Sequence, residues 1–80
     1  MRNYKTSVLL IEDDANLVFI LTRFLESLNM KVGSSYTAAD GLNKALTNKY
    51  QIIIIDIGLP DSDGFKIIEQ IRLIDNTKPI

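Results

Sequence analysis

Ile52–Gly64 reads I-I-I-I-D-I-G-L-P-D-S-D-G, in which four consecutive isoleucines end on the carboxylate of Asp56. Side chains alternate between the two faces of a strand, so this run predicts a strand over Ile52–Asp56 that protein covers on both faces. Gly58 and Pro60 mark the loop that follows. In open α/β sheets, ligands bind in the crevice beyond the carboxyl ends of the strands. The stretch therefore places one carboxylate where a binding site is expected.

Composition limits what the chain can be. Its 80 residues allow at most one domain, and 46% hydrophobic with 24% charged residues is typical of a soluble globular protein. Cysteine and histidine are absent, which excludes disulfides, histidine-ligated zinc and phosphorylation on histidine within the chain. The lack of cysteine suits the reducing cytoplasm, where we expect the protein to act. A net charge of −1 argues against nucleic-acid binding, and no apolar run approaches the roughly 20 residues of a membrane span.

A second apolar run ends in acids near the start of the chain. Ser7–Ile11 is short and apolar, which predicts a buried strand. Glu12, Asp13 and Asp14 follow it directly. Asp14 is expected to cap a helix over Ala15–Leu28, whose apolar residues recur at helical spacing and form one face. These residues are Leu17, Ile20, Leu21, Phe24, Leu25 and Leu28.

Four further patterns complete the chain. Met30–Ser34 is more polar and predicts an edge strand, which needs only one covered face. Thr37–Asp40 resembles a capping box and predicts a second helix. The narrow apolar stripe of that helix consists of Ala38, Leu42, Ala45 and Leu46. Phe65–Ile74 has the spacing of a third helix, which Asp75–Thr77 should end. Lys78–Ile80 looks like the start of another strand.

The alternating order of strands and helices predicts a parallel sheet with helices on its faces, because short right-handed connections leave few other topologies. Parallel strands end at one edge, so Glu12 and Asp13 should lie near Asp56. Converging carboxylates repel one another unless one is protonated or a cation neutralises them, and Mg²⁺ accepts carboxylate, carbonyl and water oxygens. Taken separately, the acids could simply be solvated, with Asp14 capping a helix and Asp56 solvating the turn at the end of its strand.

V-L-L-I-E-D-D at Val8–Asp14, together with Ile52–Gly64, resembles the receiver domain of two-component response regulators and hybrid histidine kinases over essentially the whole chain. The resemblance implies a flavodoxin-like α/β fold with a parallel sheet. It also implies a phosphoacceptor of a phosphorelay rather than an enzyme, either in a response regulator or as the receiver part of a hybrid kinase.

The resemblance also assigns roles to individual residues. Asp56 would take a phosphoryl group from a histidine kinase or a histidine phosphotransfer protein. Glu12, Asp13 and Asp56 would hold Mg²⁺, and Gly58 would add its backbone carbonyl as a ligand. Asp14 does not match the metal pair and stays a helix cap.

The sequence departs from that family at its end. A complete receiver has five strands in the order 2-1-3-4-5, whereas residues 1–80 make up a partial receiver that stops near the start of the fourth strand. Strands four and five are missing, and with them a Ser or Thr, a Lys and an aromatic residue of the family's site. The strand Ile52–Asp56 would then have a bare outer edge. We expect the isolated chain to self-associate through this edge, to borrow the missing strands from a partner, or to fold poorly.

Two other functions are alternatives to the predicted role as a phosphoacceptor. A truncated or degenerate receiver could act as a protein-interaction or dimerisation module that needs no phosphorylation. A nucleotide-binding fragment of the flavodoxin or Rossmann type would share the architecture, but the chain has neither G-x-G-x-x-G nor a phosphate loop ending in G-K-[ST]. The sequence therefore favours the phosphoacceptor, with the interaction module as the alternative.

Overall fold

The computed structural model describes residues 6–74 and 79–80, and within them strands and helices alternate along the chain. The predicted order of elements is confirmed, and the predicted bounds of the strands agree within one residue. The predicted helix end at Asp75–Thr77 and the strand-like start at Lys78 lie outside the described residues. The elements are β1 (Thr6–Ile11), α1 (Ala15–Ser27), β2 (Met30–Ser35), α2 (Ala38–Thr47), β3 (Ile52–Ile55) and α3 (Gly64–Ile74).

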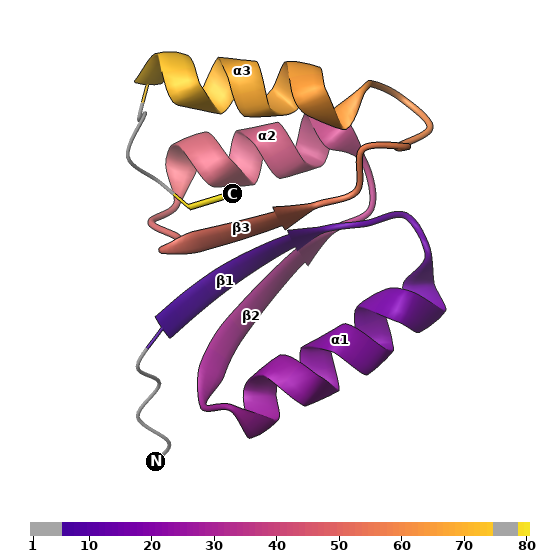
Figure 1. Cartoon of the computed structure of the whole chain (residues 1–80), viewed down its shortest axis with the longest axis vertical. Coiled ribbons are helices and arrows are strands. Elements are labelled where there is room, and N and C mark those ends of the chain that lie inside the picture. The colour runs from indigo at the N-terminus through magenta and orange to yellow at the C-terminus, as the bar shows by residue number, and fades with distance from the viewer. Residues whose placement is uncertain (1–5, 75–78) are drawn as a thin grey trace.

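β1 lies at the centre of a parallel sheet with the strand order β2-β1-β3. Val8 pairs with Val32 on one side and with Ile52 on the other. Helices α2 and α3 cover one face of the sheet and α1 lies on the other (Figure 1). Val8–Ile11 are at most 1% exposed, as an apolar run in a strand covered on both faces should be. The edge position predicted for the second strand is confirmed.

Polar side chains begin both of the first two helices. The Asp14 carboxylate accepts the N–H groups of Asn16 and Leu17 at 3.0 and 3.3 Å, so its predicted role as a cap is confirmed. Thr37 Oγ1 accepts the N–H of Asp40 at 3.1 Å at the start of α2. These bonds satisfy backbone donors that have no partner inside a helix.

The main core lies between the sheet and helices α2 and α3. Gly41 brings α2 close to β1, because a Cβ on this residue would lie 2.6 Å from Ile11 Cδ1. The buried residues of this core are Leu9, Ile11, Ala38, Ala45, Ile53, Leu59, Ile67 and Ile71. In residues 6–74 and 79–80, no helix is long and apolar enough to span a membrane.

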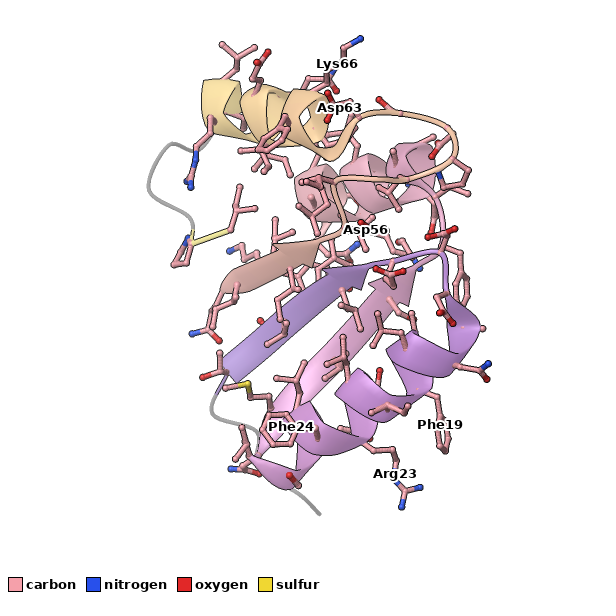
Figure 2. The ribbon with its side chains drawn as sticks, turned by 45° about the vertical axis from the view of Figure 1, so that its right-hand side comes forward. Phe19, Arg23, Phe24, Asp56, Asp63 and Lys66 are labelled. Carbon is pink, nitrogen blue, oxygen red and sulfur yellow. The ribbon has the colours of Figure 1, made fainter. Side chains whose placement is uncertain are left out.

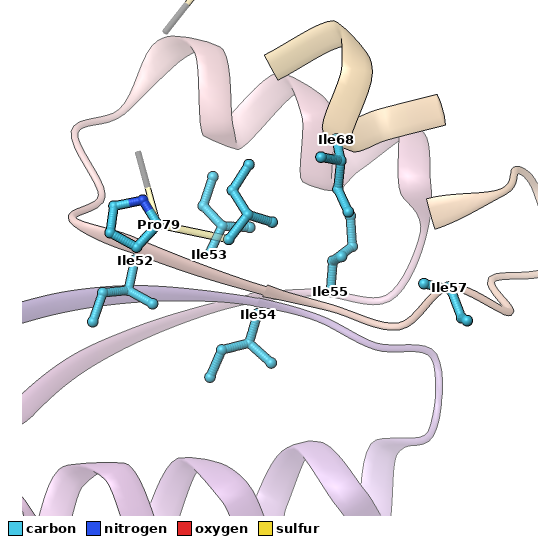
Figure 3. Close-up of a pocket in the computed structure, with 8 residues that line it drawn as sticks. Ile52, Ile53, Ile54, Ile55, Ile57, Ile68 and Pro79 are labelled. Carbon is cyan, nitrogen blue, oxygen red and sulfur yellow. The ribbon is translucent and has the colours of Figure 1, made fainter. Parts of the chain in front are cut away.

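The predicted coverage of both faces of the isoleucine strand is wrong. Ile53 is 0% exposed in the main core, whereas Ile54 points to the α1 side and is 39% exposed (Figure 3). The reason is that α1 packs chiefly against β2 and does not extend over β3. Among the described residues of α1, Val18 is the only one that is buried. Much of the apolar face predicted for this helix is consequently exposed, at Leu17, Ile20, Phe24 and Leu28.

An apolar groove of about 440 Å³ follows the outer edge of β3. Its walls come from β3 and from Ile57, Ile68, Pro79 and Ile80 (Figure 3). The N–H of Ile53 donates to the carbonyl of Pro79 at 3.0 Å, so Pro79 already bonds to this edge. Backbone groups alternate in direction along a strand, and the backbone N–H of Ile55 therefore faces the same outer side as that of Ile53, whereas the side chain of Ile55 packs against the main core.

Candidate functional site

Three carboxylates meet where β1 and β3 end. Glu12 and Asp13 follow β1, and Asp56 follows β3, which pairs with β1 up to Ile11 and Ile55. The N–H of Asp56 donates to the Ile11 carbonyl at 2.9 Å, which extends the strand pairing into the site. One carboxylate oxygen from each acid lies within 4.8 Å of the other two. The structure thus brings together the acids that the sequence placed at one sheet edge. Figure 2 shows Asp56 at the end of β3.

The electrostatics of this cluster disfavour three negative charges. Partial burial raises the pKa of Glu12 above its ordinary value, the N–H of Asp14 opposes that shift, and the charges of Asp56 and Asp13 add to it. The Asp14 N–H lies 3.2 Å from Glu12 Oε1. A cation bound among the three oxygens would remove this repulsion.

The donor set suits a hard divalent cation. It consists of carboxylate oxygens on a partly exposed edge, where water can fill further coordination positions. Mg²⁺ binds in this way, through a few carboxylates and several waters, whereas zinc prefers nitrogen and sulfur ligands. Glu12, Asp13 and Asp56 therefore fit Mg²⁺ by chemistry and spacing, and their role as ligands stays a prediction.

The loop after β3 turns back on itself and holds Asp56 in place. Gly58 donates its N–H to Asp56 Oδ1 at 2.9 Å, and Gly64 donates to the Ile57 carbonyl at 3.2 Å. A Cβ on Gly64 would lie 2.6 Å from Ile57 Cα and 2.7 Å from the Asp56 carbonyl oxygen, so only glycine fits there. Leu59 is buried and anchors the loop in the core. The loop places Gly58 beside Asp56, and the role of the Gly58 carbonyl as a metal ligand stays a prediction.

The other acids of the loop are helix caps and lie outside the cluster. Asp63 accepts the N–H of Phe65 at 2.9 Å at the start of α3 (Figure 2). Asp61 reaches α2 and accepts the N–H groups of Ala38 and Ala39. An Asp-Gly pair before a helical pattern could have predicted the role of Asp63. No sequence signal links Asp61 to a helix that begins 23 residues earlier.

Comparisons of the sequence and of the fold with known proteins point to the same family. A sequence model described as "Response regulator receiver domain" matches residues 8–80. Response regulator ArlR of Staphylococcus saprophyticus is 40% identical over 75 residues, which are 94% of this chain and 34% of that protein. The chain spans about a third of the length of the curated relatives it matches.

Solved structures give the same result for the fold. The non-phosphorylated HemR receiver domain from Leptospira biflexa has a TM-score of 0.88 and 31% identity, over 94% of this chain and 60% of that one. Response regulator TrrA of Thermotoga maritima, in complex with Mg²⁺-BeF, has a TM-score of 0.86 and 21% identity, over 89% of this chain and 62% of that one. TrrA in complex with the histidine kinase ThkA has a TM-score of 0.86 and 20% identity, over 91% and 63%. The predicted flavodoxin-like receiver architecture is confirmed by these likenesses.

Proposed function

Because this chain belongs to the family of response regulator receiver domains, we propose that it accepts a phosphoryl group on Asp56. We further propose that Mg²⁺ is held by Glu12, Asp13, Asp56 and the backbone carbonyl of Gly58. The observation that carries this proposal is the convergence of three carboxylate oxygens within 4.8 Å at the carboxyl ends of paired strands.

The transfer would use the Asp56 carboxylate as the nucleophile. One of its oxygens attacks phosphorus, the new O–P bond forms, and the P–N bond to a partner's phosphohistidine breaks. The imidazole leaves with the bonding electron pair, and an acyl phosphate remains on Asp56. Mg²⁺, when bound, supplies positive charge that offsets the repulsion between the carboxylate and the phosphoryl oxygens. Gly58 N–H, which donates to Asp56 Oδ1, keeps the nucleophile oriented.

The donor would be a histidine kinase or a histidine phosphotransfer protein. The chain contains no histidine, so the phosphohistidine has to come from a partner. TrrA, which shares the fold, forms a complex with a histidine kinase. We place this exchange in the cytoplasm and regard the chain as a phosphoacceptor rather than an enzyme, either in a response regulator or in a hybrid kinase.

Acetyl phosphate tests the phosphoacceptor directly. With Mg²⁺ present, the wild-type chain should gain the mass of one phosphoryl group, because Asp56 is the only carboxylate that both ends a strand and accepts the Gly58 N–H in the part of the chain described. Asp56→Asn should gain nothing, since its amide is not nucleophilic. Intact mass spectrometry measures both. Equal uptake by the two proteins would mean that the phosphoacceptor is another residue.

The exposed apolar surfaces favour a second function, a protein-interaction or dimerisation module that acts without phosphorylation. The groove beside β3 and the exposed side chains of Leu17, Ile20 and Phe24 in α1, with Leu28 just after it, would both gain from burial. We expect the chain to self-associate through the β3 edge at tens of micromolar. Static light scattering would give a mass above that of a monomer, and Ile54→Lys, which changes an exposed side chain that lines the groove, should lower it. A folded wild-type monomer at this concentration would rule out the self-association.

A further inference from the structure

Asp61 joins the phosphoacceptor loop to the start of a different helix. Its Oδ1 accepts the Ala38 N–H at 2.7 Å and its Oδ2 accepts the Ala39 N–H at 3.0 Å. These are the first two N–H groups of α2, and neither has a partner within the helix. Both carboxylate oxygens of Asp61 are therefore used in a two-point contact between the loop and α2. The bonds also hold the pKa of Asp61 below its ordinary value.

The helix does not depend on Asp61 alone. Thr37 Oγ1 accepts the next N–H, that of Asp40, at 3.1 Å, so α2 has a local cap of its own. The loop has fewer supports. Apart from Asp61, its described anchors are the buried Leu59, the bond from Gly64 N–H to the Ile57 carbonyl and the bond from Gly58 N–H to Asp56 Oδ1. Loss of the Asp61 contact should consequently affect the loop more than the helix.

We propose that Asp61 is a positioning residue for the Asp56 site, which it serves by fixing the loop Ile57–Asp63 against α2. The two bonds hold the segment that carries Gly58, whose N–H orients Asp56 and whose carbonyl is the proposed ligand. Asp61 touches neither the cation nor the phosphoryl group in this scheme. The expected effect on phosphorylation rests on the proposed function, whereas the support of the loop by α2 rests on the hydrogen bonds alone.

Two variants of Asp61 and one control distinguish an effect on the loop from an effect on the helix. Asp61→Ala removes the contact between them, and Asp61→Asn is a milder form that loses the charge and one acceptor oxygen. Thr37→Ala is the matched control, because it removes a cap from the same end of α2 and leaves Asp61 in place. All three proteins are compared with wild type as full chains at a temperature where each is folded.

The first readout is amide hydrogen exchange without metal. In both Asp61 variants, the amides of Gly58 and Gly64 should exchange faster than in wild type, whereas Thr37→Ala should speed exchange only at the start of α2. Unchanged exchange at Gly58 and Gly64 in both Asp61 variants, or an equal increase in Thr37→Ala, would overturn the proposal. This result does not depend on whether the chain takes up phosphate.

The second readout is the Mg²⁺ concentration that gives half the maximal rate of phosphorylation by acetyl phosphate. We expect Asp61→Ala to raise this concentration about tenfold, as removal of an indirect support of a metal site does, and to keep most of the rate at saturating Mg²⁺. Thr37→Ala should leave the concentration unchanged. An unchanged value in Asp61→Ala contradicts the positioning role. If wild type itself takes up no phosphate, the proposed function fails and hydrogen exchange alone decides the role of Asp61.

Discussion

Replacing Glu12 by Gln and Asp13 by Asn together should abolish stabilisation by Mg²⁺ and slow phosphoryl uptake on Asp56 about a hundredfold or more. Both side chains keep their size, so the variant removes charge and leaves the packing intact. In wild type, Mg²⁺ at about ten times its Kd should stabilise the fold by about 1.4 kcal/mol, roughly 5–10 °C in Tm for a small domain. The double variant should show no such rise, because a single carboxylate remains in the cluster.

Without metal, the same variant should be slightly more stable than wild type. The three acids repel one another, and this repulsion contributes to the raised pKa of Glu12. At a partly exposed edge the gain should be at most about 1 kcal/mol. Asp63→Asn is the control, since it changes a loop carboxylate that caps α3 and lies outside the cluster. Thermal unfolding with and without Mg²⁺ measures all three proteins. A Tm rise in the double variant equal to that of wild type would show that the ion binds elsewhere.

Ile53→Ala should be far more damaging than Ile54→Ala, although the two isoleucines are neighbours in the same strand. Ile53 is 0% exposed in the core under α2 and α3, and truncating it should cost about 2–5 kcal/mol. A domain of this size has about 4–12 kcal/mol of stability in total, so the variant should be close to unfolding. Ile54 is 39% exposed on the other face, and its truncation should cost only about 1 kcal/mol.

Urea unfolding with linear extrapolation measures this difference as a shift in midpoint at similar slope. The comparison controls for strand propensity, because both variants replace isoleucine by alanine within β3. Equal destabilisation by the two variants would mean that the α1 side of β3 is covered in solution. It would then support self-association, which the light-scattering measurement examines independently.

The parts of the fold that local sequence patterns determine were predictable. The order of the elements follows from hydrophobic spacing, and the cap at Asp14 follows from its place before a helical pattern. The convergence of Glu12, Asp13 and Asp56 needed only one further rule, that parallel strands end at the same edge. The residue types alone then pointed to a cation.

What the sequence could not supply was knowledge of which surfaces other elements reach. The isoleucine run of β3 and the stripe of α1 are equally apolar along their lengths, but α1 lies over β2 and leaves Ile54 and Phe24 exposed. Nor do spacing rules connect Asp61 with Ala38, because that contact depends on the path of the loop between β3 and α3. Both features depend on how elements pack in the tertiary structure, and neither produces a periodic pattern in the sequence.

The alternation of strands and helices also fixes the electric field at the site. Each helix begins where a strand ends, so α1, α2 and α3 all start at the edge that carries the acidic cluster (Figure 1). The start of each helix has a macrodipole equivalent to roughly half a positive charge. Asp14, Asp61 and Asp63 each accept backbone N–H at one of these ends, where the helix dipole offsets part of their negative charge. Glu12, Asp13 and Asp56 cap no helix, so the charge of these three acids remains to attract a divalent cation to the point where they meet.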